Sequence, residues 1–331
     1  MLNKIPGGIV TAAFLLTFAG AAAAGHVAVP LLKRFRIGQT VRDDGPATHL
    51  AKMGIPTMGG LIFLIPASVV LAALSAYERR VAPALLAVIG FGLVGLVDDA
   101  LKVRRRSKDG LTAEQKTAGQ LVVGAAFATY AAFSQYVGTS VALPLTGLSR
   151  LVDIPVWIYI PATVFVMYAT SNAVNLTDGV DGLASSVTAI VSAALTVAAA
   201  VSVREDGAAA LTAAFAGGCL GFLLFNAHPA KVIMGDCGSL ALGGMVSAAA
   251  VMMRAHWIIL FFGAVYVAEA LSVMIQVSHY KRTKRRVFKM APLHHHFELS
   301  GWGENRIVLA FCGVTAAFSL LGFLALFWRA F

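Results

Sequence analysis

Charged residues are scarce in this 331-residue chain. Asp, Glu, Lys and Arg make up 13% of it, and 58% of the residues are hydrophobic. A soluble domain carries about 25% charged residues. With a mean hydropathy of +0.79, this composition excludes an ordinary soluble domain and predicts an integral membrane protein.

Cysteine is equally scarce. The chain has Cys219, Cys237 and Cys312, an odd number of scattered residues, and two of them lie inside apolar runs. This excludes a disulfide framework and shows no zinc-type spacing. The apolar runs also lack the period-2 alternation of a transmembrane barrel, so membrane-spanning segments are expected to be helices.

Long apolar runs are what the chain has in abundance. A helix needs about 20 apolar residues to cross a bilayer, and ten runs approach that length: approximately 7–31, 56–76, 82–100, 118–138, 154–173, 183–203, 208–226, 238–254, 257–279 and 307–328. We expect an all-α integral membrane protein with about ten transmembrane helices, forming a single polytopic transmembrane domain over residues 1–331. The first run resembles a signal peptide at its alanine-rich end, but Lys4 is a thin basic region and nine runs follow, so a retained helix is expected.

Most of the 26 Lys and Arg residues fall in alternate loops. Because basic loops stay in the cytoplasm, both termini are expected outside and the loops that follow odd-numbered runs inside. For most of these charges, topology and lipid headgroup contact are sufficient explanations. The loop 139–153 then lies outside and is expected to form a small extracellular hairpin.

Acidic residues stand at the cytoplasmic ends of apolar runs. Asp98 and Asp99 end the third run, and Asp98 shares a helical face with Lys102 at i,i+4. The simpler interpretation is an ion pair at the membrane surface. Two adjacent acids beside one lysine instead favour a metal or proton-transfer role, since ionisable residues at this depth are functional candidates. Lys116 begins the fourth run and should point to the same surface.

The stretch 172–182 separates the fifth and sixth runs. If the helix continues, Asn172, Asn175 and Asp178 share one face, with Asp181 three residues further on. Two glycines weaken the helix here. A capped interruption would instead expose backbone N–H groups that suit phosphate. A polar turn is the simpler alternative.

Asp236 lies in a glycine-flanked stretch before the eighth run, where it could cap that helix; the glycines favour close approach of a bulky ligand. At the start of the second run, Pro56 and Thr57 are expected to begin a helix, with Gly59 and Gly60 in its first turn. These glycines leave room for a close neighbour or ligand. Small-residue helix packing is the alternative.

Glu269 lies in the middle of the ninth run, where we expect a buried, hydrogen-bonded or protonated structural group. His294, His295 and His296 follow in the last cytoplasmic loop. A zinc site is one interpretation, but consecutive histidines splay around a helix and no cysteine accompanies them. Contact with phosphate or uracil is favoured.

Four motifs now stand in order: Asp98-Asp99-Ala-Leu-Lys102, Asn172 to Gly182, Met234-Gly235-Asp236-Cys237-Gly238-Ser239, and His294-His295-His296-Phe297-Glu298. With Pro56-Thr57-Met58-Gly59-Gly60 ahead of them, the chain closely resembles the bacterial phospho-N-acetylmuramoyl-pentapeptide transferases, a branch of the polyprenyl-phosphate N-acetylhexosamine-1-phosphate transferases. The resemblance covers nearly the whole length. The triple-histidine element is what resembles the muramoyl-pentapeptide branch.

The resemblance implies that undecaprenyl phosphate attacks the sugar-linked phosphorus of UDP-MurNAc-pentapeptide, which releases UMP and forms lipid I, the first membrane step of peptidoglycan synthesis. It implies a Mg²⁺-dependent homodimer in the bacterial inner (plasma) membrane, among membrane lipids and without nucleic acid. It further implies a cytoplasmic active-site cleft, an outside hairpin and a broken ninth helix. Direct attack and a covalent phospho-aspartate intermediate both stay open.

Site roles are carried over by motif. Asp236 is the first choice as metal ligand, and Asp98 and Asp99 flank the lipid phosphate as further candidate ligands, with Asp98 as base or orienting group. Oxygen-rich aspartate clusters suit magnesium. Phosphates would be held by Lys52, Thr57, Lys102 and Lys116. The nucleotide end would be shaped by Asn172, Asn175, Asp178, Asp181, Asn226 and Gln276. The nucleotide or sugar phosphate would contact His294, His295 and His296.

Four positions depart from the family pattern. Cys237 stands where a threonine is expected, Ile233 where an aromatic is usual, and Gly303 and Asn305 where prolines are usual. None removes a charged group.

Two rival functions fit parts of the sequence. A sister enzyme that transfers GlcNAc-1-phosphate is disfavoured by the triple histidine. A secondary transporter would place its acids near the bilayer midplane, often on related repeats, whereas here only Glu269 suits that position.

Overall fold

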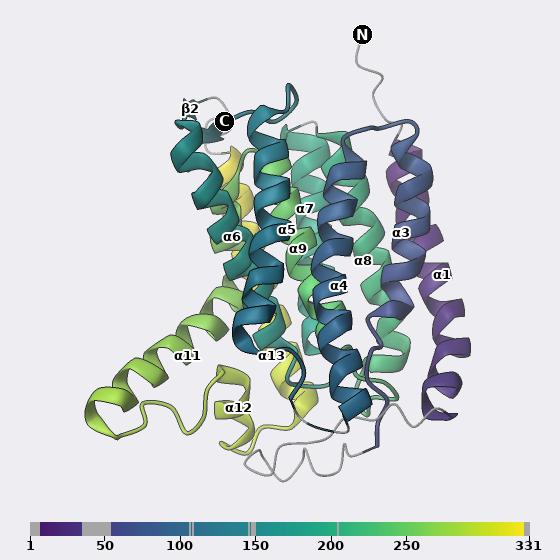
Figure 1. Cartoon of the computed structure of the whole chain (residues 1–331), viewed down its shortest axis with the longest axis vertical. Coiled ribbons are helices and arrows are strands. Elements are labelled where there is room, and N and C mark those ends of the chain that lie inside the picture. The colour runs from purple at the N-terminus through teal and green to yellow at the C-terminus, as the bar shows by residue number, and fades with distance from the viewer. Residues whose placement is uncertain are drawn as a thin grey trace.

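The computed structural model describes residues 7–34, 54–105, 107, 109–144, 146, 150–203 and 205–327. Lys52 lies outside these described residues. Long helices stand side by side in one bundle, and α11 and α12 project from its lower end (Figure 1).

The described chain runs in order through α1 (Gly7–Arg34), α3 (Leu61–Ser75), α4 (Val81–Arg105), α5 (Ala113–Phe133), strands β1 (Ser140–Ala142) and β2 (Leu151–Asp153), α6 (Val156–Thr177), α7 (Leu183–Val197), a π-helical turn (Ala198–Val203), α8 (Asp206–Asn226), α9 (Asp236–Met252), a 3-10 turn (His256–Ile258), α10 (Ile259–Phe262), α11 (Ala264–Thr283), α12 (Leu293–Glu298) and α13 (Glu304–Phe327). The expected all-α class is confirmed over this part of the chain. The two short strands pair antiparallel, Ser140 opposite Asp153, as the hairpin expected in loop 139–153.

Five of the described helices are long and apolar enough to cross a membrane: Gly8–Arg34, Val81–Arg105, Leu183–Val201, Asp206–Asn226 and Glu304–Phe327. His256–Phe262 and Ala264–Thr283 meet at an angle of 87° and make a sixth candidate if the bent pair is counted as one span. The broken ninth helix is therefore confirmed, and so is a multi-pass helical membrane protein. The ten-span count and the outside termini stay predictions.

Helices α8 and α9 form the centre of the bundle. Nearly every residue of α9 after Asp236 is buried, and α9 packs mainly against α4 and α6, while α8 packs mainly against α1 and α7. Close packing at one point of the α4–α9 contact depends on Gly95, because a Cβ there would collide with the backbone of Asp236. This approach sets the start of α9 beside the end of α4.

The second helix begins at Leu61 rather than at Pro56 and Thr57, so the predicted start is wrong. Residues 56–60 instead run alongside residues 232–234. The Ile233 N–H donates to the Pro56 carbonyl at 2.8 Å, and Gly60 N–H donates to the Met234 carbonyl at 2.8 Å. Backbone hydrogen bonds to a distant segment outweigh the local helix-start signal. The room left by Gly59 and Gly60 is confirmed, and Val232, Cys237 and Gly238 lie in it.

Candidate active site

Three carboxylates meet where α4 and α9 touch. Asp98 and Asp99 lie in the last two turns of α4 and are each 3% exposed, and Asp236 is the first residue of α9. One carboxylate oxygen from each lies within 4.8 Å of the others. Residues far apart in sequence thus form one acidic cluster, here called the aspartate cluster.

Asp99 caps α9. Its Oδ1 accepts the backbone N–H of Asp236 at 3.2 Å and its Oδ2 accepts that of Cys237 at 3.0 Å. The interpretation of Asp236 as the cap is therefore wrong. Gly235 has φ +76°, and a Cβ there would lie 2.6 Å from Asp99 Oδ2 and 3.0 Å from Thr57 Oγ1. Because Gly235 has no side chain, Asp99 and Thr57 can lie this close to its backbone. Thr57 therefore lies beside the aspartate cluster.

Two lysines reach the aspartate cluster. The Lys102 ammonium lies 2.6 Å from Asp98 Oδ2 and 2.9 Å from Asp236 Oδ2, and the Lys116 ammonium lies 2.9 Å from the same Asp236 oxygen. Asn175 donates its amide N–H to Asp236 Oδ1 at 2.8 Å. The expected pairing of Asp98 with Lys102 and the orientation of Lys116 are both confirmed.

The donor set of the cluster fits magnesium. It consists of carboxylate oxygens, the ligands this ion takes from protein while it keeps waters and phosphate oxygens. Three carboxylates against two ammonium groups also leave negative charge in excess. The Lys102 and Lys116 side chains are 34% and 20% exposed, so anionic ligands can reach them. The site therefore has groups for both a divalent cation and phosphate.

The stretch 172–182 contains the last residues of one helix and the loop that precedes the next. Helix α6 ends at Thr177 with Asp178 as its C-cap, and α7 begins after Gly182, which has φ +73°. The continuous helical face proposed through Asp178 therefore does not form. Asn175 faces the aspartate cluster, whereas the Asn172 amide donates to Gln120 Oε1 on α5 at 3.1 Å. Of the two asparagines, only Asn175 joins the cluster.

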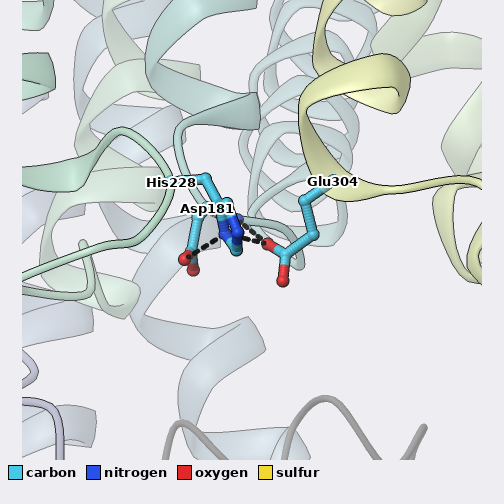
Figure 2. A group of neighbouring side chains, drawn as sticks. All are labelled: Asp181, His228 and Glu304. Atoms are coloured by element: carbon cyan, nitrogen blue, oxygen red, sulfur yellow. Dashed lines mark hydrogen bonds and ion pairs between the residues drawn. The ribbon is translucent and has the colours of Figure 1, made fainter.

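Asp181 belongs to a second group, with His228 and Glu304 (Figure 2). His228 Nδ1 lies 3.2 Å from Asp181 Oδ2 and 3.6 Å from Glu304 Oε2. Asp181 Oδ2 also accepts the Ala230 N–H at 3.0 Å, and Glu304 Oε2 accepts the Asp181 N–H at 3.0 Å. These contacts join the 178–182 loop, the segment after α8 and the start of α13.

Sequence reasoning missed His228 and Glu304 as members of a polar group. In the stretch that contains His228, the interpretation relied on the glycines around Asp236. In the stretch that contains Glu304, it relied on the replaced prolines on either side. Their adjacency to motif residues was the available signal. Only the fold brings them to Asp181.

Two residues predicted to shape the nucleotide end of the site form hydrogen bonds within the protein through their side-chain amides. Asn226, 3% exposed, accepts from Ser185 Oγ at 2.8 Å and donates to the Val232 carbonyl at 3.0 Å. Gln276 donates to the Phe288 carbonyl at 3.1 Å and accepts two backbone N–H groups, from Val287 and Phe288. Both side chains hold loops in place.

The three histidines occupy α12 and each uses Nδ1 differently. His294, 1% exposed, faces Glu269 Oε1 at 3.2 Å. His295 faces Glu298 Oε2 at 2.7 Å, and His296 accepts the backbone N–H of Lys289 at 3.2 Å. Glu269 is fully buried and hydrogen-bonded, as expected for its position.

His294 reaches the 178–182 loop. Its Nε2 lies against Gly179, where a Cβ would collide with the imidazole. The structure thus brings α12 to the same loop that carries Asp178 and Asp181.

Comparison with known proteins places this architecture in a family. Residues 81–254, which hold the aspartate cluster and Asp181, match the glycosyl transferase family 4. The phospho-N-acetylmuramoyl-pentapeptide-transferase of Acetivibrio thermocellus is 49% identical over 313 residues, covering 95% of this chain and 94% of that protein. That of Desulforamulus reducens is 48% identical over 305 residues, covering 91% and 90%. That of Clostridium kluyveri is 46% identical over 313 residues, covering 94% and 98%. The chain therefore belongs to glycosyl transferase family 4 and, within it, to the phospho-N-acetylmuramoyl-pentapeptide-transferases.

Proposed function

We propose that this protein transfers phospho-MurNAc-pentapeptide from UDP-MurNAc-pentapeptide to undecaprenyl phosphate, giving lipid I and UMP. The observation that carries the proposal is the aspartate cluster with its two lysines, held at the meeting of α4 and α9. The names of the full-length relatives support the same reaction.

The proposed setting is the inner (plasma) membrane of a bacterium. The protein would cross it about ten times as a homodimer surrounded by lipid, with both termini outside and the aspartate cluster in a cytoplasmic cleft. The excess of Lys and Arg in alternate loops supports this orientation.

The proposed metal is Mg²⁺, with Asp236 as first ligand and Asp98 and Asp99 as further ligands. When bound, the ion neutralises charge on the two phosphate groups that must approach each other. The all-oxygen donor set supports this choice over zinc.

The protein's own residues act mainly through charge and position. Lys102 and Lys116, now paired with Asp236, would turn their ammonium groups toward phosphate oxygens. They would stabilise the negative charge that builds up as the lipid phosphate oxygen forms its bond to the sugar-linked phosphorus and UMP leaves with the electrons of the broken P–O bond. Since the lipid phosphate is already anionic near neutral pH, Asp98 would orient this phosphate.

The contacts of the aspartates favour direct attack over a phospho-aspartate. Both oxygens of Asp99 accept α9 backbone N–H groups, and Asp236 Oδ1 accepts the Asn175 amide. A carboxylate engaged in this way is a weak nucleophile. A metal ligand or positioning group can keep such contacts.

The nucleotide and sugar would lie along the 178–182 loop and α12. Direct contact would come from Asn175, Asp178, Asp181, His294, His295 and His296, while Lys52 and Thr57 would hold phosphates. The side chains of Asn172, Asn226 and Gln276, which bind within the protein, would shape this end of the site.

The test is a reconstitution of the purified protein with radiolabelled UDP-MurNAc-pentapeptide, undecaprenyl phosphate and Mg²⁺. We expect one UMP released for each lipid-linked product, and no product after chelation of the metal. UDP-GlcNAc serves as the matched donor. Lipid product from UDP-GlcNAc alone would favour the sister enzyme, and no product from either donor would refute a transferase.

A further inference from the structure

Glu269 is a buried acid that the proposed reaction does not use. It lies in α11, is 0% exposed, and accepts three hydrogen bonds from the start of α12. The Leu293 N–H donates to Oε2 at 2.7 Å and the His294 N–H donates to Oε1 at 3.2 Å. The third contact is His294 Nδ1, 3.2 Å from Oε1. A buried carboxylate is costly without such donors, and here α12 supplies all three.

His294 links Glu269 to the 178–182 loop. Its ring is 1% exposed, and among the described residues its Nε2 has no hydrogen-bond partner. That atom lies against Gly179, between Asp178 and Val180. In a neutral imidazole, donation from Nδ1 to Glu269 makes Nε2 the acceptor. Glu269 thereby orients the ring that touches the 178–182 loop.

Other contacts also hold α12, among them the Lys289 N–H that His296 Nδ1 accepts at 3.2 Å. Phe297 of α12 packs against Trp302 at 4.8 Å and Phe311 at 6.0 Å between ring centroids. These ring contacts join α12 to the segment that leads into α13 and to α13 itself. The α11 helix leaves the bundle after the 87° bend, and α12 lies beneath it (Figure 1). The Glu269 contacts join the start of α12 to α11 and so contribute to how α12 is turned toward the loop.

We propose that Glu269 is a positioning residue for the transfer reaction. Through His294 it holds α12 in register with the 178–182 loop, and so places Asp178 and His295 for the UDP-sugar substrate. Glu269 itself touches no substrate. The inference rests on the proposed function and extends it to a residue outside the site's lining.

The decisive variant is Glu269→Gln, which keeps the size of the side chain. A carboxamide turns an N–H₂ group toward one of the three donors, so at least one buried contact is lost. We expect the KM for UDP-MurNAc-pentapeptide to rise about tenfold, and kcat to stay within about threefold. The KM for undecaprenyl phosphate and the affinity for Mg²⁺ should not change, because the aspartate cluster is untouched.

The matched control is Glu205→Gln. Glu205 is also a buried glutamate, 9% exposed, and pairs with Arg80 at 2.8 Å. Glu205 directly precedes α8, and Asn226, which is assigned to the nucleotide end of the site, is the last residue of that helix. The two residues therefore lie at opposite ends of α8. This variant should leave both KM values unchanged. Equal effects from both glutamates would mean that general destabilisation is being measured, and would overturn the inference.

A double-mutant cycle tests the second half of the chain of contacts. Gly179→Ala should raise the KM for the UDP-sugar in an otherwise wild-type protein, because the new Cβ meets the His294 ring. In a His294→Ala background the same change should cost less than about twofold, since the ring is gone. This cycle also decides the matter if Glu269→Gln does not fold.

Besides equal effects from the two glutamates, three outcomes overturn the inference. A folded Glu269→Gln protein with wild-type KM removes the role of Glu269, and additive effects of Gly179→Ala and His294→Ala remove the link to the loop. If the wild-type protein makes no lipid-linked product, both the proposed function and this inference are overturned. This outcome is distinguishable from the other two, in which the wild-type protein is active.

Discussion

Asp98→Asn tests the aspartate cluster most directly. Asp98 Oδ1 accepts the Leu111 N–H at 2.7 Å, and Oδ2 lies 2.6 Å from the Lys102 ammonium. Asparagine can keep the first contact through its carbonyl oxygen. It then presents an N–H₂ group to Lys102, and one of three candidate metal ligands loses its charge.

The expected size of the effect follows from these contacts. A hydrogen bond to a charged group is worth about 1.5–3 kcal/mol, which corresponds to about 10-fold to about 10²-fold in rate. We expect kcat to fall by about 10²-fold. Bound Mg²⁺ stabilises the folded protein against unfolding. At a Mg²⁺ concentration of about 100 times the wild-type Kd, this stabilisation is about 2.7 kcal/mol, and it falls to about 1.4 kcal/mol if the variant binds Mg²⁺ about tenfold more weakly.

Two measurements check this prediction. UMP release gives kcat, and the Mg²⁺ dependence of unfolding in detergent gives metal binding without turnover. The Kd of the UDP-sugar should stay within about twofold. Asp153→Asn is the control, the same change on the exposed strand β2. Wild-type kcat together with an undiminished Mg²⁺ effect would refute the role assigned to Asp98.

Two further predictions concern the surroundings of the cluster, and a third concerns Glu205. Gly95→Ala should lower Mg²⁺ affinity and thermal stability, because its Cβ meets the Asp236 backbone, whereas Gly313→Ala in α13, with nothing within 4 Å, should do neither; unchanged Mg²⁺ binding in Gly95→Ala would contradict the close approach of α4 and α9. Lys116→Met should raise the KM for the UDP-sugar more than it changes Mg²⁺ affinity, since its ammonium is assigned to phosphate; isothermal titration with each ligand separates the two. Burial raises the pKa of Glu205 to about 7, against the opposing charge of Arg80 and with help from Glu78. Its folded-state pKa lies above the ordinary value, so its contribution to stability is present below about pH 4.5 and is lost as pH rises to about 7. The melting temperature of Glu205→Gln should therefore gain on that of the wild type between pH 5 and pH 8, and a difference independent of pH would rule this out.

The helical membrane class was predictable because it depends on composition and run length, which are local properties. Asp98 with Lys102 was predictable for the same reason, since i,i+4 spacing on a helix fixes proximity. The orientation of Lys116 followed from its place at the start of α5, where Thr112 and Gln115 form a capping box.

What the sequence did not predict depends on contacts between distant segments. The start of α3 at Leu61 is set by hydrogen bonds from residues 56–60 to residues 232–234. The joining of Asp181 to His228 and Glu304 requires three chain segments to meet. Gln276 binds the loop at residues 287–288, a partner that no local pattern indicates.

The adjacent pair Asp98-Asp99 shows how local and distant effects divide within one motif. Successive residues of an α-helix point about 100° apart, so the two carboxylates cannot serve one partner in the same way. Asp98 faces Lys102 and the Leu111 N–H, while Asp99 faces the first N–H groups of α9. Asp99 thus determines where α9 begins and hence where Asp236 lies. Each carboxylate oxygen has two lone pairs, so Asp99 can cap α9 and still offer an oxygen to a cation. A capping role and a metal role are therefore compatible in this residue, and the second depends on the first.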